Sequence, residues 1–209
     1  MIIDSEILQA QESRYRATFI NSLAGVKQAF LIGSKSSAGH SNLAIFNSLI
    51  HIGANPPLWG FICRPDTVKR DTLENILETG EYSFNFVRHT DSEKAHQTSA
   101  KYALEESEFA AVGFNEQCYE GFSAPFVSEA PIKIGMKFEE KIDIAINGTI
   151  LVIGSISFID IDEKLIAPDG FVDLDQAALL HCSGLDAYFE TRLIHRLSYA
   201  KTDKWPSKL

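Results

Sequence analysis

Residues 55–76 constrain the fold of this chain most strongly, because they run from an apolar strand through a cationic turn into a helix with a clear start signal. The strand is predicted over 58–63, directly after a rigid Asn-Pro-Pro connection. Asp71 followed by Glu74 is typical of a capping box, in which each side chain bonds a backbone N–H of the first turn. The helix is therefore predicted over 72–79, and the turn before it becomes the place to look for a ligand.

This turn carries the cations Arg64, Lys69 and Arg70. Together with Thr72 and the backbone donors of the helix start, they can converge on one dianion, because guanidinium groups and helix N-termini both favour phosphate. The carboxylate of Asp71 is expected at the N-terminus of the helix, so a phosphate should lie beside the N-cap residue rather than on the helix axis. The alternative is a solvated basic turn, which the charges alone favour.

The rest of the chain predicts a β-rich α+β barrel with flanking helices rather than alternating βαβ units. An amphipathic helix is predicted over 5–21 on the outside of a sheet, and a short one over 107–111. The polar stretch 91–112 is interpreted as an excursion that borders a site, and Asn147 with Gly148 predicts a tight hairpin turn. The other predicted strands are 29–34, 43–52, 81–87, 133–138, 141–146 and 150–161.

Length and charge limit the classes of function. A chain of 209 residues with 45% hydrophobic content can bury a sizeable core, and no linker or repeat divides it, so we expect a single domain over 1–209. The net charge of −9 disfavours a nucleic-acid or anionic-membrane surface. No apolar run approaches the roughly 18 residues of a membrane span, and the first residues lack signal-peptide features. We therefore expect a cytoplasmic protein without a membrane segment.

Common catalytic and metal-binding motifs are missing from the sequence. It contains no G-x-G-x-x-G, P-loop, H-E-x-x-H or G-x-S-x-G pattern. The six histidines show no i, i+4 pairing and the three cysteines are widely separated, so neither a metal site nor a disulfide framework is predicted. No catalytic side chain is predicted, which counts against a hydrolase.

Five short segments occur in an order that resembles one protein family. They are Asn-Leu-Ala-Ile-Phe-Asn-Ser at 42–48, Asn-Pro-Pro at 55–57, Arg-Asp-Thr-Leu-Glu-Asn-Ile at 70–76, Ser-Glu-Phe at 107–109 and Gly-Leu-Asp-Ala-Tyr at 184–188. Through these segments the chain resembles, over most of residues 10–200, the flavin reductase-like proteins of the FMN-binding split-barrel class. The resemblance implies a six-stranded Greek-key split barrel, a homodimer, and one FMN per subunit near the dimer interface.

The implied ring site follows residues 42–48. The backbone N–H groups from Leu43 to Asn47 would address the O2, O4 and N5 region of the isoalloxazine. The side chains of Asn47 and Ser48 would add polar contacts, whereas the apolar side chains of this segment are interpreted as barrel core, since only the backbone donors are needed.

The implied phosphate site is the cationic turn. Arg64, Arg70 and Thr72 would hold the phosphate. Lys69 is a weaker candidate, because a lysine acts as a mobile point charge rather than a fork. The implied cofactor-binding residues, of which the last two belong to the excursion, are Asn42, Leu43, Ala44, Phe46, Asn47, Ser48, Arg64, Lys69, Arg70, Thr72, Thr98 and Ser99.

The resemblance implies an FMN-dependent flavin oxidoreductase in which hydride passes from NADH or NADPH to flavin N5. The cofactor supplies the reactivity in such chemistry, so the missing acid–base pair is compatible with an enzyme. The nicotinamide would stack in an open cleft near His96, Tyr102 or Tyr188, and the reduced flavin could serve a partner monooxygenase. Two alternatives stay open, a non-enzymatic FMN-binding electron carrier or redox-sensing module and a ligand-free dimer.

The C-terminal region bears on the dimer. Residues 176–199 carry more apolar side chains than a terminal tail needs, which favours packing across a two-fold axis, with burial in the same subunit as the alternative. Residues 201–209 are predicted to be frayed apart from Trp205, which could anchor them.

Overall fold

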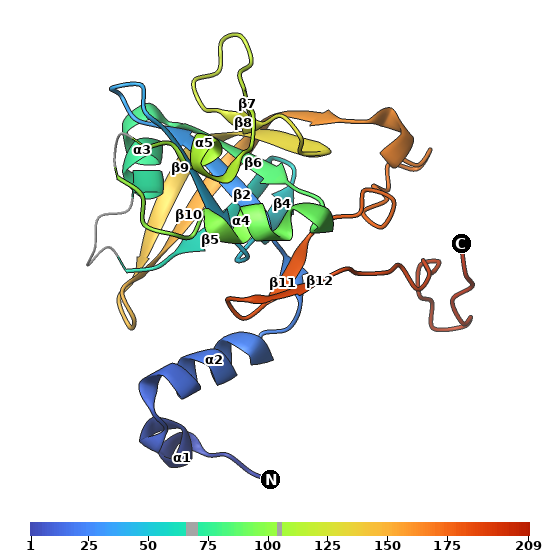
Figure 1. Cartoon of the computed structure of the whole chain (residues 1–209). Helices are drawn as coiled ribbons and strands as arrows, with labels where there is room; N and C mark the ends of the chain where they lie inside the picture. Colours follow the sequence, from blue (N-terminus) through green and yellow to red (C-terminus); the bar gives the residue numbers. More distant parts are fainter. Residues whose placement is uncertain (66–70, 104–105) are drawn as a thin grey trace.

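The computed structural model describes residues 1–65, 71–103 and 106–209, and Figure 1 shows a curled sheet with two terminal segments leading away from it. The elements, in which η denotes a 3-10 helix, are α1 (Ser5–Ala10), α2 (Ser13–Leu23), β1 (Lys27–Gln28), β2 (Phe30–Lys35), β3 (Ser41–Phe46), β4 (Ile50–Ala54), β5 (Pro57–Cys63), α3 (Asp71–Thr79), β6 (Glu81–Phe86), η1 (His89–Asp91), α4 (Ser92–Gln97), α5 (Glu108–Val112), β7 (Glu116–Gln117), β8 (Phe126–Val127), β9 (Ile132–Ile144), β10 (Thr149–Ile161), η2 (Glu163–Leu165), β11 (His181–Ser183) and β12 (Ala187–Phe189).

The main sheet is antiparallel and has the strand order β3-β2-β6-β9-β10-β5-β4. Its two outer strands, β3 and β4, follow one another in the chain and are joined by residues 47–49. Four Cα steps reach at most roughly 14 Å, whereas seven flat strands would spread over about 29 Å. The sheet must therefore curl until its outer strands approach each other, which makes it a split barrel. The implied count of six strands is not confirmed, because the main sheet has seven.

Two strand predictions are wrong in their boundaries. The predicted strand 43–52 is divided into β3 and β4, because Ser48 turns the chain away: its Oγ accepts from the Ile62 N–H at 3.0 Å and donates to the Ile62 carbonyl at 3.2 Å. The predicted strands 133–138 and 141–146 form the single strand β9, whose pairing with β10 carries a register shift between Ile153 and Gly154. The hairpin turn between β9 and β10 is confirmed.

The barrel interior is aromatic. Tyr82, Phe84 and Phe86, predicted to share one face of β6, are all buried in the main core cluster together with Phe30 and Phe61. On the opposite face of β6, Ser83 and Asn85 point away from the barrel interior and are buried under the segment that carries β8. There the amide oxygen of Asn85 accepts from the Val127 N–H at 2.8 Å, and the hydroxyl of Ser83 donates to the Pro125 carbonyl.

The helices agree with the sequence predictions in part. α3 begins at Asp71, one residue before the predicted start, and packs Leu73 and Ile76 into the core. α5 matches the predicted short helix to within one residue, whereas α4 was not predicted. The predicted single helix 5–21 is wrong, because the carboxylate of Glu12 accepts from two N–H groups at 2.9 Å and starts a new helix, α2.

Neither α1 nor α2 covers a sheet as predicted. They contain no buried residue, and Figure 1 shows them leading away from the barrel beyond the small sheet β1-β11-β12. The C-terminal segment also leaves the barrel, and Trp205 is 87% exposed, so its predicted role as an anchor is wrong. Among the helices of the described ranges, none has the length and apolar character needed to cross a membrane.

Candidate functional site

The two regions expected to bind the ring and the phosphate of a flavin meet in the fold. Asn42 lies at the start of β3 and Thr72 in the first turn of α3. The amide nitrogen of Asn42 donates to Oγ1 of Thr72 at 2.9 Å, across 30 residues of sequence. The side chain of Thr72 is buried. A ligand that extends along β3 and turns at Asn42 would therefore reach the helix start.

A buried polar network holds this junction. Oγ of Ser34, a fully buried residue at the end of β2, accepts from the amide nitrogen of Asn75 at 3.2 Å and more weakly from that of Asn42 at 3.4 Å. Buried hydroxyl and amide groups are costly unless they are hydrogen-bonded, so this set of bonds selects one position of α3 on the sheet. The helix start is thus fixed relative to β3.

β3 presents backbone donors along its outer edge. Its partner is β2 on one side only, so every second N–H points away from the sheet. The N–H of Leu43 is one of these, and by the alternation of the strand the N–H of Ile45 is the next. Ala44 and Phe46 turn their N–H groups toward β2. Of the backbone donors expected at 43–47, those of Ala44 and Phe46 are therefore used inside the sheet.

The side chains of this strand serve the core, as predicted. Leu43 is fully buried, and the ring of Phe46 packs against Phe30 and Phe61 with centroids 6.1 and 5.2 Å apart. Only the backbone edge and the flanking polar side chains of this segment are available to a ligand.

Glu108, from the first turn of α5, lies on the donor edge. Its Oε2 accepts from the Leu43 N–H at 3.0 Å. Burial raises the pKa of this carboxyl above its ordinary value, an effect that the hydrogen bond from Leu43 opposes. The carboxylate takes the position in which a ring carbonyl oxygen would accept from the same N–H, so Glu108 would have to share or yield this donor when a flavin binds.

A small cavity lies beside these groups. Its volume is about 20 Å³, which suffices for a single water molecule and excludes a flavin ring. A flavin would therefore rest along the edge of β3 rather than inside this cavity. The residues that line it are Ser36, His40, Ser41, Asn42, Asp71, Asn75, Tyr102, Ala103, Glu106 and Glu108.

The far end of β3 is linked to the small sheet β1-β11-β12. The amide nitrogen of Asn47 donates to the carbonyl of Gly184 at 2.8 Å and to Sγ of Cys182 at 3.1 Å. Cys182 pairs across the strands with Tyr188, whose hydroxyl lies 2.8 Å from Nδ1 of His96. Burial raises the pKa of Tyr188 to about 12, so the phenol stays protonated at neutral pH.

The remaining predicted residues are distributed unevenly. Ser48 is bonded to β5, and Arg64 is exposed just after that strand. Thr98 is buried and donates its hydroxyl to the Ala95 carbonyl at 2.8 Å, so it closes the last turn of α4. Ser99 is exposed. Lys69 and Arg70 lie outside the described residues.

The structure also brings in polar residues that the sequence did not single out. Ser34 and Asn75 stood inside a predicted strand and helix, and their contacts join residues 41 positions apart. Glu108 belonged to a segment used for the family resemblance, but its bond to Leu43 spans 65 positions. The only sequence signal was a polar residue within an otherwise apolar element. Within the described ranges, no group of three or more His, Cys, Asp or Glu residues could hold a metal ion.

Comparisons with known proteins give the family and the fold. The model of the family "Flavin reductase like domain" matches residues 26–184. The chain is similar to a candidate flavin reductase with a split barrel domain from Shewanella frigidimarina, whose crystal structure is known. The two sequences are 46% identical, and the two structures superimpose with a TM-score of 0.92. The alignment covers 96% of this chain and 100% of the other.

More distant relatives are similar over differing lengths. Nitrilotriacetate monooxygenase component B from Bacillus cereus has a TM-score of 0.82 at 20% identity, with 94% of this chain and 98% of that chain covered. An uncharacterised protein of Halalkalibacterium halodurans is 33% identical over 119 residues. That match takes in 56% of this chain and 57% of the relative, so the chain spans little more than half the length of that protein.

Proposed function

Because the chain belongs to the flavin reductase-like family, whose model matches residues 26–184, we propose that it is an FMN-dependent oxidoreductase that transfers hydride from NADH or NADPH to flavin. The observation that carries the proposal is the 2.9 Å contact between Asn42 and Thr72. It puts the start of a donor edge next to a helix start, as a ligand with a flat ring at one end and a phosphate at the other requires.

The proposed ring contacts are the outward N–H groups of Leu43 and Ile45. Donors aimed at ring carbonyl oxygens would stabilise the negative charge that develops over the pyrimidine part of the ring on reduction. Asn47 holds its own end of the strand in place through Gly184 and Cys182. The bound flavin supplies the hydride-accepting chemistry, and the protein supplies orientation and electrostatics.

The proposed phosphate contacts are the Thr72 hydroxyl and the cationic turn with Arg64, Lys69 and Arg70. The Thr72 oxygen accepts from Asn42, which leaves its O–H to donate to a phosphate oxygen. Two guanidinium groups and a lysine would complete a charge-assisted site for a dianion. Selectivity for FMN over riboflavin is the direct expectation.

The proposed nicotinamide contacts are Tyr188 and His96, which the structure joins at 2.8 Å beyond the Asn47 end of β3. We further propose a cytoplasmic homodimer acting as one domain. The component B relative is by its name part of a monooxygenase, which supports a monooxygenase as a possible acceptor of the reduced flavin.

The test is spectroscopic and kinetic. Purified protein titrated with FMN should show the shifted absorbance of a bound flavin, and it should oxidise NADH or NADPH in steady state when free flavin is supplied. A protein that binds FMN and is reduced by dithionite but is inert to both nicotinamides would be an electron carrier or redox sensor. A protein that takes up no FMN at micromolar concentration would refute the site.

A further inference from the structure

Glu108 is held opposite the edge of β3 by the hydrophobic core. The next residue, Phe109, is 2% exposed and belongs to the same buried cluster as Leu43. α5 packs against β3 through this cluster. The carboxylate of Glu108 is thereby presented to the Leu43 N–H, from which it accepts at 3.0 Å. The contact is built into the packing of the helix on the strand.

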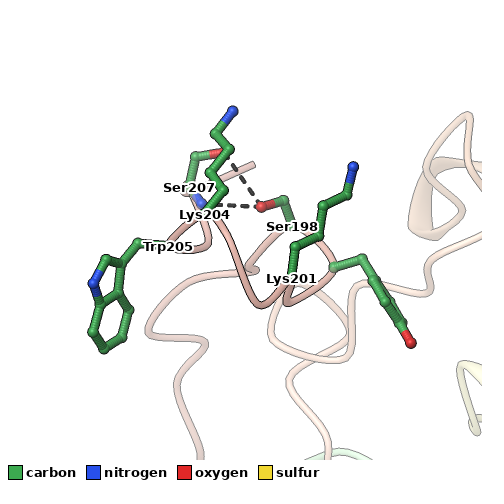
Figure 2. A pocket seen from close by; sticks show the side chains of 6 residues that line it. Ser198, Lys201, Lys204, Trp205 and Ser207 are labelled. Carbon is green, nitrogen blue, oxygen red and sulfur yellow. Dashed lines mark hydrogen bonds between the residues drawn. The ribbon is translucent and has the colours of Figure 1, made fainter.

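The charge of this carboxylate has little support apart from that N–H. Among the described residues, no Lys or Arg forms an ion pair with Glu108. Lys94, on the neighbouring helix α4, donates instead to a carbonyl at the C-terminal end of α5. Lys201 and Lys204 border a separate open hollow of about 200 Å³ in the C-terminal segment, as Figure 2 shows. The Leu43 N–H is thus the group that most stabilises the ionised form.

The titratable groups that face Glu108 do not offset its charge. They line the same small cavity and are Asp71 at the start of α3, His40 in the turn between β2 and β3, and Tyr102 and Glu106 in the excursion. β3 itself has no titratable side chain, and Glu116, on β7, is bonded to the Ser41 hydroxyl at 2.9 Å. Burial raises the pKa of Glu108, and the charges of Asp71 and Glu106 raise it further. The carboxylate should therefore take up a proton readily once its backbone donor is lost.

The residue before Glu108 leaves this turn of α5 incompletely satisfied. Ser107 is the N-cap residue of α5, but its hydroxyl makes no capping bond. Its Oγ is buried and has no hydrogen-bond partner among the described residues. An N-cap hydroxyl ordinarily accepts from an N–H of the first turn, and a buried hydroxyl without a partner is costly. Movement of this turn would let the Ser107 hydroxyl find a partner, which lowers the cost of withdrawing Glu108 from Leu43.

A flavin ring would need the same donor. The pyrimidine part of the ring presents carbonyl oxygens, for which the outward N–H groups of β3 are the proposed partners. One N–H cannot serve a carboxylate and a ring oxygen at full strength, so the two acceptors exclude each other. Reduction develops negative charge over this part of the ring. An ionised carboxylate beside it would repel the reduced form more strongly than the neutral oxidised form.

We propose that Glu108 competes with the flavin for the Leu43 N–H and thereby sets how tightly each redox form of the flavin is held. The inference rests on the proposed function, and it adds to that site a residue that weakens binding. Flavin binding displaces the carboxylate, which takes up a proton as it leaves its donor. Affinity for the flavin should therefore fall as pH rises and Glu108 ionises.

Riboflavin is the probe for the ring contact, because it has no phosphate whose own ionisation would change with pH. Glu108→Gln removes the charge, and Glu108→Ala removes the acceptor. Fluorescence titration at pH 8 should give a riboflavin dissociation constant at least about threefold lower than that of the parent for Glu108→Gln, and about tenfold lower for Glu108→Ala. The constants of the parent and Glu108→Gln should approach each other at pH 5. His40 is present in all three proteins, so its titration does not account for this difference.

The matched control is Glu93→Gln. It makes the same change at an exposed residue in the first turn of the neighbouring helix α4. Glu93 has no contact with the N–H groups of β3 among the described hydrogen bonds, so this variant should leave the riboflavin constant unchanged at both pH values.

A second titration separates the effect of charge from a structural effect. FMN reduced with dithionite under anaerobic conditions is titrated alongside oxidised FMN. Glu108→Gln should lower the dissociation constant of the reduced form by a factor at least about twice that for the oxidised form, because charge develops over the pyrimidine part only on reduction. A loosened fold would change both constants by the same factor.

Weaker riboflavin binding in both variants would make Glu108 a flavin ligand and overturn the inference. A parent that binds FMN, with riboflavin constants unchanged in both variants, would also overturn it and leave the proposed function intact. Tighter flavin binding in the variants of a protein that never oxidises NADH or NADPH would support the inference and refute the proposed reaction. Failure of the parent and both variants to take up either flavin would refute both.

Discussion

The Glu108 carboxylate accepts a hydrogen bond from the backbone N–H of Leu43 over 3.0 Å, and so occupies a donor on the free edge of the barrel. This contact joins the excursion to the strand proposed to carry the flavin ring. Burial makes the ionised form of Glu108 unfavourable and raises its pKa above the ordinary value of 4.5. The folded protein therefore holds the proton of Glu108 to a higher pH than the unfolded chain does.

The raised pKa of Glu108 makes the flavin-free protein less stable as pH rises. A carboxyl with a raised pKa in the folded state contributes its full stability below pH 4.5, where both states are protonated, and loses it as pH rises through the folded pKa. Glu108→Gln removes this loss. Flavin-free Glu108→Gln should be more stable than the parent at pH 7, by less than about 1 kcal/mol because the carboxylate is partly solvated, and nearly equal to it at pH 4.

Urea unfolding at both pH values measures this difference. Glu120→Gln, at an exposed carboxylate that is not among the charges raising the pKa of Glu108, is the control and should leave stability unchanged at both. Lower stability of Glu108→Gln at pH 7 would show that the hydrogen bond to Leu43 outweighs the cost of burying the charge.

Thr72→Val tests the phosphate contact. Loss of one hydroxyl donor to a dianion should raise the dissociation constant of FMN at least about tenfold and that of riboflavin less than about threefold. Fluorescence titration measures both constants. Thr79→Val makes the same change at the other end of α3, where the hydroxyl donates to the Asn75 carbonyl at 2.8 Å, and it should not alter the preference between the two flavins. Equal losses of both flavins in Thr72→Val would remove Thr72 from the phosphate site.

Two Lys–Asp pairs with nearly equal distances should differ in strength. Lys133 and Asp160 are 2.9 Å apart with the lysine buried, whereas Lys141 and Asp143 are 2.8 Å apart and more exposed. Asp160→Asn leaves a buried ammonium without its counter-charge and should lower the free energy of unfolding by about 2–3 kcal/mol. Asp143→Asn should lower it by less than about 1 kcal/mol. Guanidinium unfolding of both variants gives the comparison, and equal costs would contradict it.

The same aspartate predicts acid sensitivity. The hydrogen bond from the Tyr119 hydroxyl and then the pairing with Lys133 hold the pKa of Asp160 below its ordinary value of 3.8. Its contribution to stability is therefore complete above that value and is lost as pH falls further. Asp160→Asn should narrow the difference in stability between pH 6 and pH 3.

Gly33→Ala tests the covering of the outer face of the barrel. A Cβ at this buried position would overlap the carbonyl oxygen of Pro125 and the hydroxyl of Ser83, which should cost about 3 kcal/mol. At Gly53, in β4, the nearest atom to an added Cβ is the Pro56 carbonyl oxygen at 3.6 Å, so Gly53→Ala should cost less than about 1 kcal/mol. Denaturation midpoints that shift equally would contradict the tight packing at Gly33.

Sequence patterns located the elements whose signals are local. The alternation in β6 and the start signal of α3 depend on neighbouring residues, and both predictions agree with the structure to within one residue. The family resemblance added the barrel and the two ends of the proposed site. The hydrogen bonds of Asn42 to Thr72 and Ser34 join the two segments on which these ends were predicted.

The errors occurred where a distant contact decides the local structure. The apolar run from Leu43 to Ile52 reads as one strand, and it is divided because Asn47 bonds Gly184 and Ser48 bonds Ile62. Similarly, the amphipathic pattern over 5–21 predicted a covering helix, but α1 and α2 bury none of their residues, and α2 meets only the small sheet at its C-terminal end. Neither fact is encoded within the segment concerned.

The carboxylate of Glu108 also has a protective effect. An unpaired strand edge is a template on which another chain can add a strand, the first step of aggregation. α5 and its glutamate close this opening at Leu43, and α4 packs near the same strand. A chain whose excursion has been cut by protease should therefore precipitate more readily than the intact one, even while its barrel remains folded.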